Sequence, residues 1–264
     1  MLPATPAPNE EISMNTTSEF HAEPAAFAPG DAANAGSEIR KVLVWDAPVR
    51  VFHWLMVLSF AGAYLTAESE RWRLLHVSLG YTMAGLVAFR IVWGLIGTRH
   101  ARFADFVRGP AAVVRYIGGM LRGAPKRHVG HNPVGALAIV ALLGLTLAIA
   151  GSGWAVFNDA GGDRLEGIHE LAANAMLVVI GIHIAGVLLA SRLGRENLIG
   201  AMFTGRKAGR PEDGIRSAWR SVAVLMLLAV FAFWWLQWQA PPVAADMTDQ
   251  AAATSAGHKD RDND

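Results

Sequence analysis

Five long apolar stretches dominate the chain and restrict the folds that it can adopt. A helix needs about 20 apolar residues to cross the hydrocarbon core of a bilayer, and it satisfies its own backbone hydrogen bonds there. The first and last stretches are near the lower limit of length but are rich in Leu, Val, Phe and Trp. The sequence therefore predicts an all-α integral membrane protein with five spans: Val51–Ala67, Leu75–Gly97, Val134–Trp154, Gly167–Leu193 and Val222–Trp238.

The positive charges are distributed unevenly between the two sides of these spans. Seventeen of the 23 Lys and Arg residues precede the first span or lie in the two long loops that follow the second and fourth spans. Five lie on the opposite side, and Arg90 lies well inside a span. Cytoplasmic loops of membrane proteins carry such an excess of positive charge. We therefore expect a multi-pass membrane protein whose N-terminus is cytoplasmic and whose C-terminus lies on the outer side.

Four histidines lie in or at the ends of the apolar stretches. His169 and His183 are fourteen residues apart, nearly four helical turns, so they share one helix face about 21 Å apart along the axis. His53 lies near the cytoplasmic start of the first span, and His76 opens the second span at the outer side. The depths therefore predict two pairs: His53 with His183 near the cytoplasm, and His76 with His169 near the periplasm.

Paired imidazoles at two depths suit b-type haem, whose iron takes one His from each of two facing helices. The chain has no cysteine, which excludes covalent c-type haem, thiolate-bound iron–sulfur clusters and disulfides. Zinc and non-haem iron sites usually include carboxylate or thiolate ligands, and of these four histidines only His169 has a carboxylate beside it, that of Glu170. Buried histidines can instead belong to proton relays, so a haem-free transporter or membrane scaffold remains an alternative.

Two arginines are candidates for binding haem propionates. Arg90 follows His76 by fourteen residues and so reaches the depth of the cytoplasmic pair, where a propionate would neutralise it. The alternative is that it extends to the cytoplasmic surface. Arg50 lies beside His53 at the same interface and is either a second propionate partner or an ordinary charged anchor. Small residues would let a flat macrocycle lie against a helix or would mediate helix packing: Gly62, Gly80, Gly85, Gly181 and Gly186.

The segments outside the spans differ in character. Residues 1–38 are rich in Ala, Pro, Asn, Ser and Glu and predict a disordered cytoplasmic leader, and residues 239–264 predict a disordered periplasmic tail. Apolar residues recur at helical spacing in the loop 98–133, with Arg108, Arg115 and Arg122 among them. This pattern predicts an amphipathic helix that either lies on the cytoplasmic leaflet or packs on its own bundle.

The remaining segments complete the expected organisation. Residues 39–206 would form the histidine-bearing four-helix domain, and residues 222–238 an extra spanning helix. Between them, residues 207–221 would be a cytoplasmic linker, with Gly205–Gly214 as a solvated connector. The loop histidines His100, His128 and His131 are solvated or serve a quinone or proton site, for which His131 is the best placed.

Several segments of the chain together resemble the bacterial cytochrome b561 family, which includes the b-type cytochrome subunits of nickel–iron hydrogenases. The most specific is Val44–Trp54 (VWDAPVRVFHW), and the others follow in the family's order. They are Leu75-His76, Gly80-Tyr81, Phe89-Arg90, Trp93-Gly94, Gly97–Phe103, Gly130–Pro133, His169-Glu170 and His183. The resemblance covers about Val44 to Arg206.

This resemblance implies a four-helix bundle of the bacterial inner membrane, with a periplasmic C-terminus. The bundle would carry two b haems and pass electrons between quinone and a redox partner. The axial ligands that it implies are His53, His76, His169 and His183, in the pairs already predicted from depth. The partner would be a periplasmic c-type cytochrome or another oxidoreductase subunit, such as a hydrogenase or dehydrogenase. Membrane lipid and quinone or quinol would be further partners, and we expect no nucleic acid.

A third function remains open because some family members resemble superoxide:quinone oxidoreductases. A basic funnel beside the outer haem would favour that activity. Here Arg71, Arg73 and Arg164 are offset by acidic neighbours, which weighs slightly against it: Glu68, Glu70, Asp159 and Asp163.

Overall fold

The computed structural model describes residues 39–122 and 128–239. The predicted leader and all but the first residue of the predicted tail lie outside this part of the chain. Within it, five helices are long and apolar enough to cross a membrane, so the prediction of an all-α membrane fold is confirmed. Each helix exceeds the predicted span by a few residues at one or both ends. They are α2 (Ala47–Thr66), α3 (Arg73–Ile96), α6 (Pro133–Phe157), α7 (Gly162–Gly194) and α9 (Arg220–Gln239).

Local signals begin two of these helices. Asp46 precedes α2 and its carboxylate accepts a hydrogen bond from the Val49 amide, while Asn132 accepts one from the Gly135 amide at the start of α6. In both helices a proline follows within the first two positions, where its missing N–H costs nothing. The sequence thus fixes the beginning of α2, and with it the position of the histidine two turns further on.

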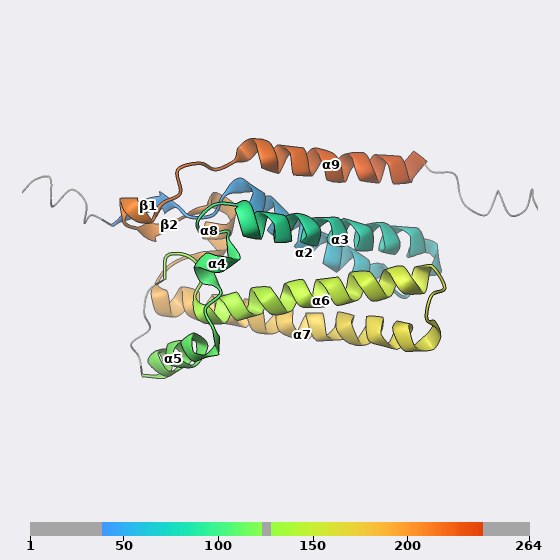
Figure 1. Ribbon diagram of the computed structural model, residues 1–264, viewed down its shortest axis with the longest axis horizontal. Helices are drawn as coiled ribbons and strands as arrows, with labels where there is room; N and C mark the ends of the chain where they lie inside the picture. The colour runs from blue at the N-terminus through green and yellow to red at the C-terminus, as the bar shows by residue number, and fades with distance from the viewer. Residues whose placement is uncertain (1–38, 123–127, 240–264) are drawn as a thin grey trace, which may run out of the picture. The chain divides into compact units, whose positions relative to one another are not determined.

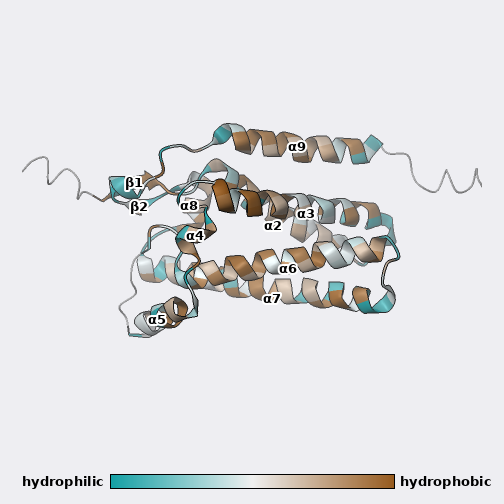
Figure 2. Cartoon of the chain, in the orientation of Figure 1, coloured by the Kyte–Doolittle hydropathy of each residue, from teal (hydrophilic) through white to brown (hydrophobic). Residues whose placement is uncertain are grey.

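Helices α2, α3, α6 and α7 form a four-helix bundle, in which α2 packs on α3, α3 on α6 and α6 on α7 (Figure 1). Each helix contributes to one apolar core cluster: Phe60, Met83, Ile149, Ala172 and Met176. Large apolar side chains such as Leu65, Val178 and Leu225 remain exposed on the outside, and apolar residues cover the helices in Figure 2. An apolar exterior of this extent suits contact with lipid.

Helix α9 lies against the outside of the bundle. It packs on α2 and α3, where its Met226 and Val230 join Leu55 and Leu86 in a second core cluster. The Trp234 indole N–H donates a hydrogen bond of 2.9 Å to the hydroxyl of Thr82 on α3. The fifth span is therefore attached to α2 and α3 rather than inserted between the bundle helices.

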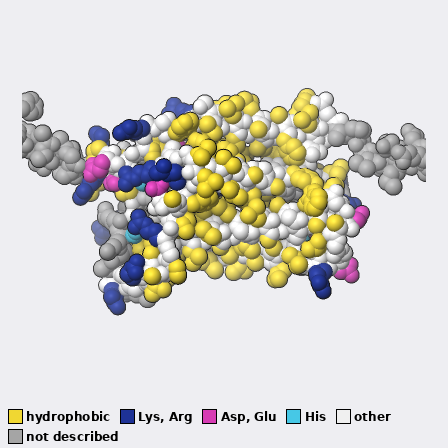
Figure 3. Space-filling view, viewed as in Figure 1, with side chains coloured by type: hydrophobic (Ala, Val, Ile, Leu, Met, Phe, Trp, Pro, Cys, Tyr) yellow, Lys and Arg dark blue, Asp and Glu magenta, His cyan; other side chains and the backbone are white. Residues whose placement is uncertain are grey.

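One end of the bundle carries most of the structure that connects the helices, and we call it the capped end. It holds the short helices α4 (Phe103–Phe106), α5 (Pro110–Leu121) and α8 (Leu198–Thr204), and strands β1 (Arg40–Leu43) and β2 (Arg206–Gly209). A 3₁₀ turn, Pro211–Asp213, follows β2, whereas another, Glu70–Trp72, joins α2 to α3 at the opposite end. Lys and Arg side chains gather at the capped end on the face seen in Figure 3.

The strands correct one expectation from the sequence. The connector Gly205–Gly214 is not merely solvated, because β2 pairs antiparallel with β1, with Arg40 opposite Gly209 and Leu43 opposite Arg206. The boundary expected between residues 206 and 207 therefore divides a strand. Strands of four residues carry little periodic signal, and the partners are far apart in the sequence, so the pairing could not be predicted.

Candidate functional site

The structure brings His76 and His169 together at the end of the bundle opposite the cap. His76 lies in the first turn of α3 and His169 in the second turn of α7, and their ring centroids are 6.1 Å apart. The Nδ1 atom of His76 lies 2.8 Å from the Ala63 carbonyl oxygen, and that of His169 lies 3.0 Å from the Ile149 carbonyl oxygen.

These two contacts determine the tautomer of each ring. A carbonyl oxygen can only accept, so each Nδ1 carries the proton and each Nε2 is left with its lone pair. Histidines that bind metals are commonly oriented in this way by a hydrogen bond from the other ring nitrogen. The Ser152 hydroxyl, 3.2 Å from Nδ1 of His169, further restricts that ring. Both imidazoles of the outer pair are therefore oriented by the backbone through Nδ1, which leaves Nε2 free to accept a bond.

A glycine permits the close approach of α6 to the His169 ring. A Cβ atom added at Gly153 would lie 2.8 Å from Cε1 of His169, closer than side chains normally pack. The neighbouring Gly151 faces open space. Gly153, which the sequence did not single out, therefore belongs to the surroundings of the outer pair.

His53 and His183 lie nearer the capped end, on α2 and α7, close enough to interact electrostatically. The Nδ1 atom of His53 is buried without a hydrogen-bond partner in the described part of the chain. Its ring packs edge-on against Trp54, which stacks on Phe203 of α8 with centroids 4.3 Å apart. The inner pair thus lacks the backbone contact that orients each ring of the outer pair.

Arg90 lies in the same region and is only 3 % exposed. Its guanidinium lies over the Phe103 ring, 4.9 Å from the centroid, and one terminal nitrogen, Nη1, has no described partner. Asp46 exerts an electrostatic influence on Arg90, but its carboxylate already accepts hydrogen bonds from Trp93 and Thr98 at 3.0 and 2.6 Å. Arg90 therefore does not extend to the surface; it is a buried cation with unused donor capacity.

Arg50, the other arginine candidate, has partners of its own. Its terminal nitrogen donates to the Phe203 carbonyl and its Nε to the Asp46 carbonyl. The bond to Phe203 attaches α2 to α8. The structure thus provides Arg50 with a structural role that the sequence did not reveal.

Of the three loop histidines, His131 lies nearest the inner pair. Its ring packs against Trp45 and Phe106, with centroids 4.4 and 4.6 Å away, and its Nδ1 is buried without a described partner. Burial lowers the pKa of His131 to about 3, and the positive charges of Arg90 and Lys207 act in the same direction. His131 is therefore neutral at physiological pH.

The other two loop histidines belong to the cap. The Nε2 atom of His100 lies 2.8 Å from the Asp213 carbonyl oxygen, which joins the loop after α3 to the turn after β2. His128 packs edge-on against Tyr116 of α5, with ring centroids 5.5 Å apart.

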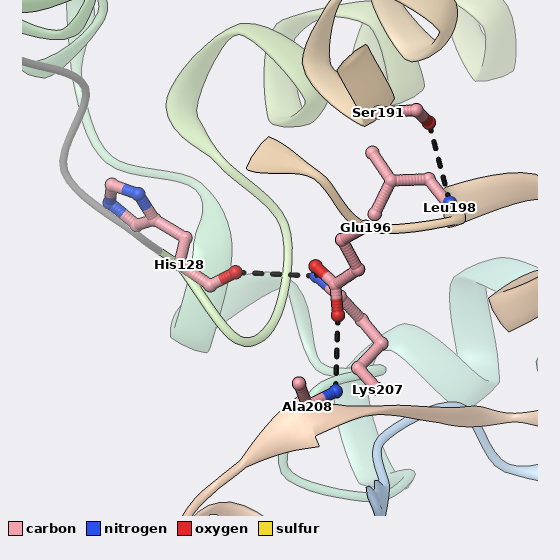
Figure 4. A network of polar contacts seen from close by, with 6 residues as sticks. All are labelled: His128, Ser191, Glu196, Leu198, Lys207 and Ala208. Carbon is pink, nitrogen blue, oxygen red and sulfur yellow. Dashed lines mark hydrogen bonds and ion pairs between the residues drawn. The ribbon is translucent and has the colours of Figure 1, made fainter. Parts of the chain in front are cut away.

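A polar network that the sequence did not suggest holds this cap together (Figure 4). The Lys207 ammonium, almost fully buried, lies 3.4 Å from the Glu196 carboxylate and donates to the His128 carbonyl at 3.3 Å. The other Glu196 oxygen accepts from the Ala208 amide at 3.1 Å. Burial lowers the pKa of Lys207, and Glu196 partly offsets this. The network connects the segment after α7, strand β2 and the segment before α6.

The unpartnered polar atoms test whether these residues fit a haem. Four buried side-chain nitrogens lack a partner in the described part of the chain, those of His53, Trp54, Arg90 and His131. All four lie in the half of the bundle next to the cap. Buried polar groups are nearly always hydrogen-bonded, so their concentration points to a missing polar ligand. No group of three or more His, Asp or Glu that could hold a bare metal ion occurs among the described residues.

The glycines separate into two kinds. Added Cβ atoms at Gly80, Gly85, Gly181 and Gly186 would meet nothing within 4 Å, so the helix surface is open there. A Cβ at Gly62 would lie 2.8 Å from Leu79, which shows that Gly62 serves the packing of α2 on α3. Paired imidazoles, open glycines and a buried cation with a free donor together fit a porphyrin that carries carboxylates.

The fold and the site define an integral membrane helical bundle in which His76 of α3 and His169 of α7 lie together. The sequence profile described as prokaryotic cytochrome b561 matches residues 44–205, more than half of the chain. The chain belongs to the prokaryotic cytochrome b561 family, and the predicted resemblance is confirmed. It is accordingly a b-type cytochrome of the membrane, which binds haem b and transfers electrons.

Curated relatives are similar over most of their length. A probable Ni/Fe-hydrogenase B-type cytochrome subunit of Rhodobacter capsulatus is 25% identical, covering 69% of this chain and 89% of the relative. The proteins of the same description from Rhizobium leguminosarum bv. viciae and Azotobacter vinelandii are 24% and 27% identical. These two alignments cover 71% and 67% of this chain, and 96% and 92% of the relatives. No solved structure matches the chain.

Proposed function

We propose that this chain binds two b haems at different depths of the inner membrane and relays electrons between the quinone pool and a redox partner protein. The observation that carries the proposal is the outer pair. His76 and His169 have ring centroids 6.1 Å apart, and each Nδ1 contacts a backbone carbonyl oxygen. Two Nε2 atoms preset in this way suit the two axial positions of one iron.

The inner pair supplies the ligands of the second haem in this proposal. His53 and His183 come from α2 and α7, and His183 follows His169 by fourteen residues on one helix. One helix therefore provides a ligand at each depth, about 21 Å apart along its axis. When bound, haem supplies one-electron redox chemistry at its iron.

The residues around the inner pair hold this second group. Arg90 binds a propionate through the donor that is unused in the protein alone, since arginine matches a carboxylate geometrically. Arg50 remains a candidate with less support, because its guanidinium already donates to backbone carbonyls. Trp54, which stacks on Phe203 of α8, packs against the His53 ring and restricts its position.

Exchange with quinone is proposed at the capped end, beside His131. Its buried Nδ1 lacks a partner among the described residues, and its neutral state leaves it able to hydrogen-bond a quinone oxygen. The excess of Lys and Arg at this end supports a cytoplasmic orientation. The C-terminus would then be periplasmic.

The descriptions of the three relatives named above support a hydrogenase as the redox partner, because each is described as a probable Ni/Fe-hydrogenase B-type cytochrome subunit. Another oxidoreductase subunit or a periplasmic c-type cytochrome remains compatible with the same geometry. A superoxide:quinone oxidoreductase has less support. The guanidinium groups of Arg71 and Arg73 lie over aromatic rings of Trp72 and Phe157 rather than forming a basic funnel.

The test is the haem content of the purified protein and of four variants. The native protein should show a b-type reduced-minus-oxidised spectrum with two haems per chain. His53→Ala and His183→Ala should each lose one haem with the same spectral component, and His76→Ala and His169→Ala should each lose the other. Variants that do not sort into these pairs would refute the ligand assignment, and a colourless native protein would favour a haem-free transporter.

A further inference from the structure

Helix α5 has two apolar sides, and only one of them is covered. The helix packs on α6, and Tyr116 on this side contacts the His128 ring. Val114, two residues earlier, points in nearly the opposite direction. It is 70% exposed, and Ile117 beside it on the helix surface is 38% exposed. The two alternatives predicted for this helix, packing on its own bundle and lying on a leaflet, therefore each describe one side of it.

Three exposed arginines lie in α5 or close to its ends. Arg115 lies within α5, while Arg108 and Arg122 flank its two ends. None of the three has an acidic partner in the described ranges, in contrast to nearby Arg102, which pairs with Asp105 at 2.8 Å. An apolar helix surface flanked by unpaired arginines is typical of helices that lie in the interface of an anionic membrane.

Helix α5 lies next to the beginning of a spanning helix. Figure 1 shows α5 beside the end of α6, where that spanning helix begins at Pro133. We propose that α5 binds anionic phospholipids of the adjoining leaflet. Val114 and Ile117 enter the boundary between headgroups and acyl chains, and the three arginines bind lipid phosphates. An acidic protein surface would match the arginines, but it would not require exposed apolar residues that adjoin a spanning helix.

The lack of cysteine in the chain allows a direct measurement of depth. A spin label is attached at V114C, or at A208C as the control, in haem-loaded full-length protein; Ala208 is an exposed position of strand β2. The protein is placed in vesicles of phosphatidylcholine with or without phosphatidylglycerol. The V114C label should be accessible to oxygen and protected from a water-soluble nickel complex, most strongly with phosphatidylglycerol. The A208C label should remain accessible to the nickel complex.

A second measurement tests the arginines. Replacing Arg108, Arg115 and Arg122 by Gln should reduce the preferential retention of phosphatidylglycerol in native mass spectrometry, by about fivefold per arginine at low salt. Replacing them by Lys should largely preserve it. The matched control changes the same amount of charge at other exposed positions of the capped end, namely Arg40, Arg206 and Arg216, and should have little effect.

Three outcomes would overturn the proposal. One is a V114C label as accessible to the nickel complex as A208C in anionic vesicles. Another is an equal decrease in phosphatidylglycerol retention when Gln replaces the three arginines of α5 and its ends, or the three control arginines. The third is protection of V114C only when an acidic partner protein is added. Because none of these measurements depends on haem ligation, they leave the proposed electron transfer untouched.

Discussion

The two histidine pairs differ in how far the protein alone prepares them. At the outer end, Nδ1 of each ring contacts a backbone carbonyl oxygen, and Gly153 lets α6 approach His169 closely. At the inner end, Nδ1 of His53 and Nη1 of Arg90 are buried without a described partner. The comparison teaches that similar ligands can be positioned in two ways, by the backbone before the cofactor binds or by the cofactor itself. The following predictions test this difference, from the largest expected effect to the smallest.

The largest effect is expected for Arg90→Met. Removing a buried cation with unused donor capacity should stabilise the haem-free protein, by about 1–3 kcal/mol. The same change should remove most of the inner haem, because a propionate would lose its partner. Thermal unfolding of the haem-free form and the haem stoichiometry of the purified protein measure the two effects.

Arg90→Lys provides the matched control for that variant. It keeps the charge but cannot bind a carboxylate through two parallel donors, so it should retain part of the inner haem. If Arg90→Met lowers both the stability of the haem-free form and the haem content, the result would contradict the view that the inner site is completed by its ligand.

An intermediate effect is expected at the outer end for Gly153→Ala. The added methyl group would meet the His169 ring, so this variant should lower stability by about 1–2 kcal/mol and broaden the spectrum of the outer haem. Gly151→Ala on the same helix faces open space and should gain the helix propensity of alanine, about 1 kcal/mol. Equal behaviour of the two variants in thermal unfolding and low-temperature spectra would show that the outer ring is not held as described.

The smallest effect is a pH dependence at the cap. The pKa of His131 is about 3 in the folded protein, below the ordinary value of 6.5 that it regains on unfolding. The unfolded chain therefore binds a proton that the folded chain does not, and stability should fall as the pH drops from about 6.5 towards 3. The melting temperatures of the native protein at pH 7.5 and pH 5 should differ by a few degrees. The corresponding difference should be smaller in His131→Asn. An unchanged difference in that variant would assign the pH dependence to other groups.

The sequence alone predicts the spanning helices well because membrane segments are long and their hydropathy signal is strong. It also pairs His76 with His169 correctly, since depth in a bilayer follows from helix length and topology. The pairing of β1 with β2 was not predictable, because four-residue strands that are distant in the sequence have no periodic pattern. Nor could the sequence distinguish Gly62, which packs against Leu79, from Gly181, which faces open space.

The buried network of the cap was missed for a related reason. Lys207 and Glu196 each follow an arginine in the loop between the fourth and fifth spans, and a charged residue in such a loop is usually solvated. Only the fold shows that Lys207 is buried against the His128 carbonyl. Asp46 was equally hidden, although its carboxylate connects the start of α2 with Trp93 and Thr98 at the end of α3.

The pairing of Arg40 with Gly209 has a consequence for biosynthesis. The ribosome completes all four bundle helices before it makes the second strand, so the sheet can close only after those helices have been synthesised. Until then the N-terminal strand has no partner in this sheet, so the capped end cannot reach its final form while the bundle helices are being made. The order of translation therefore makes this sheet form after the helices on which the cap lies.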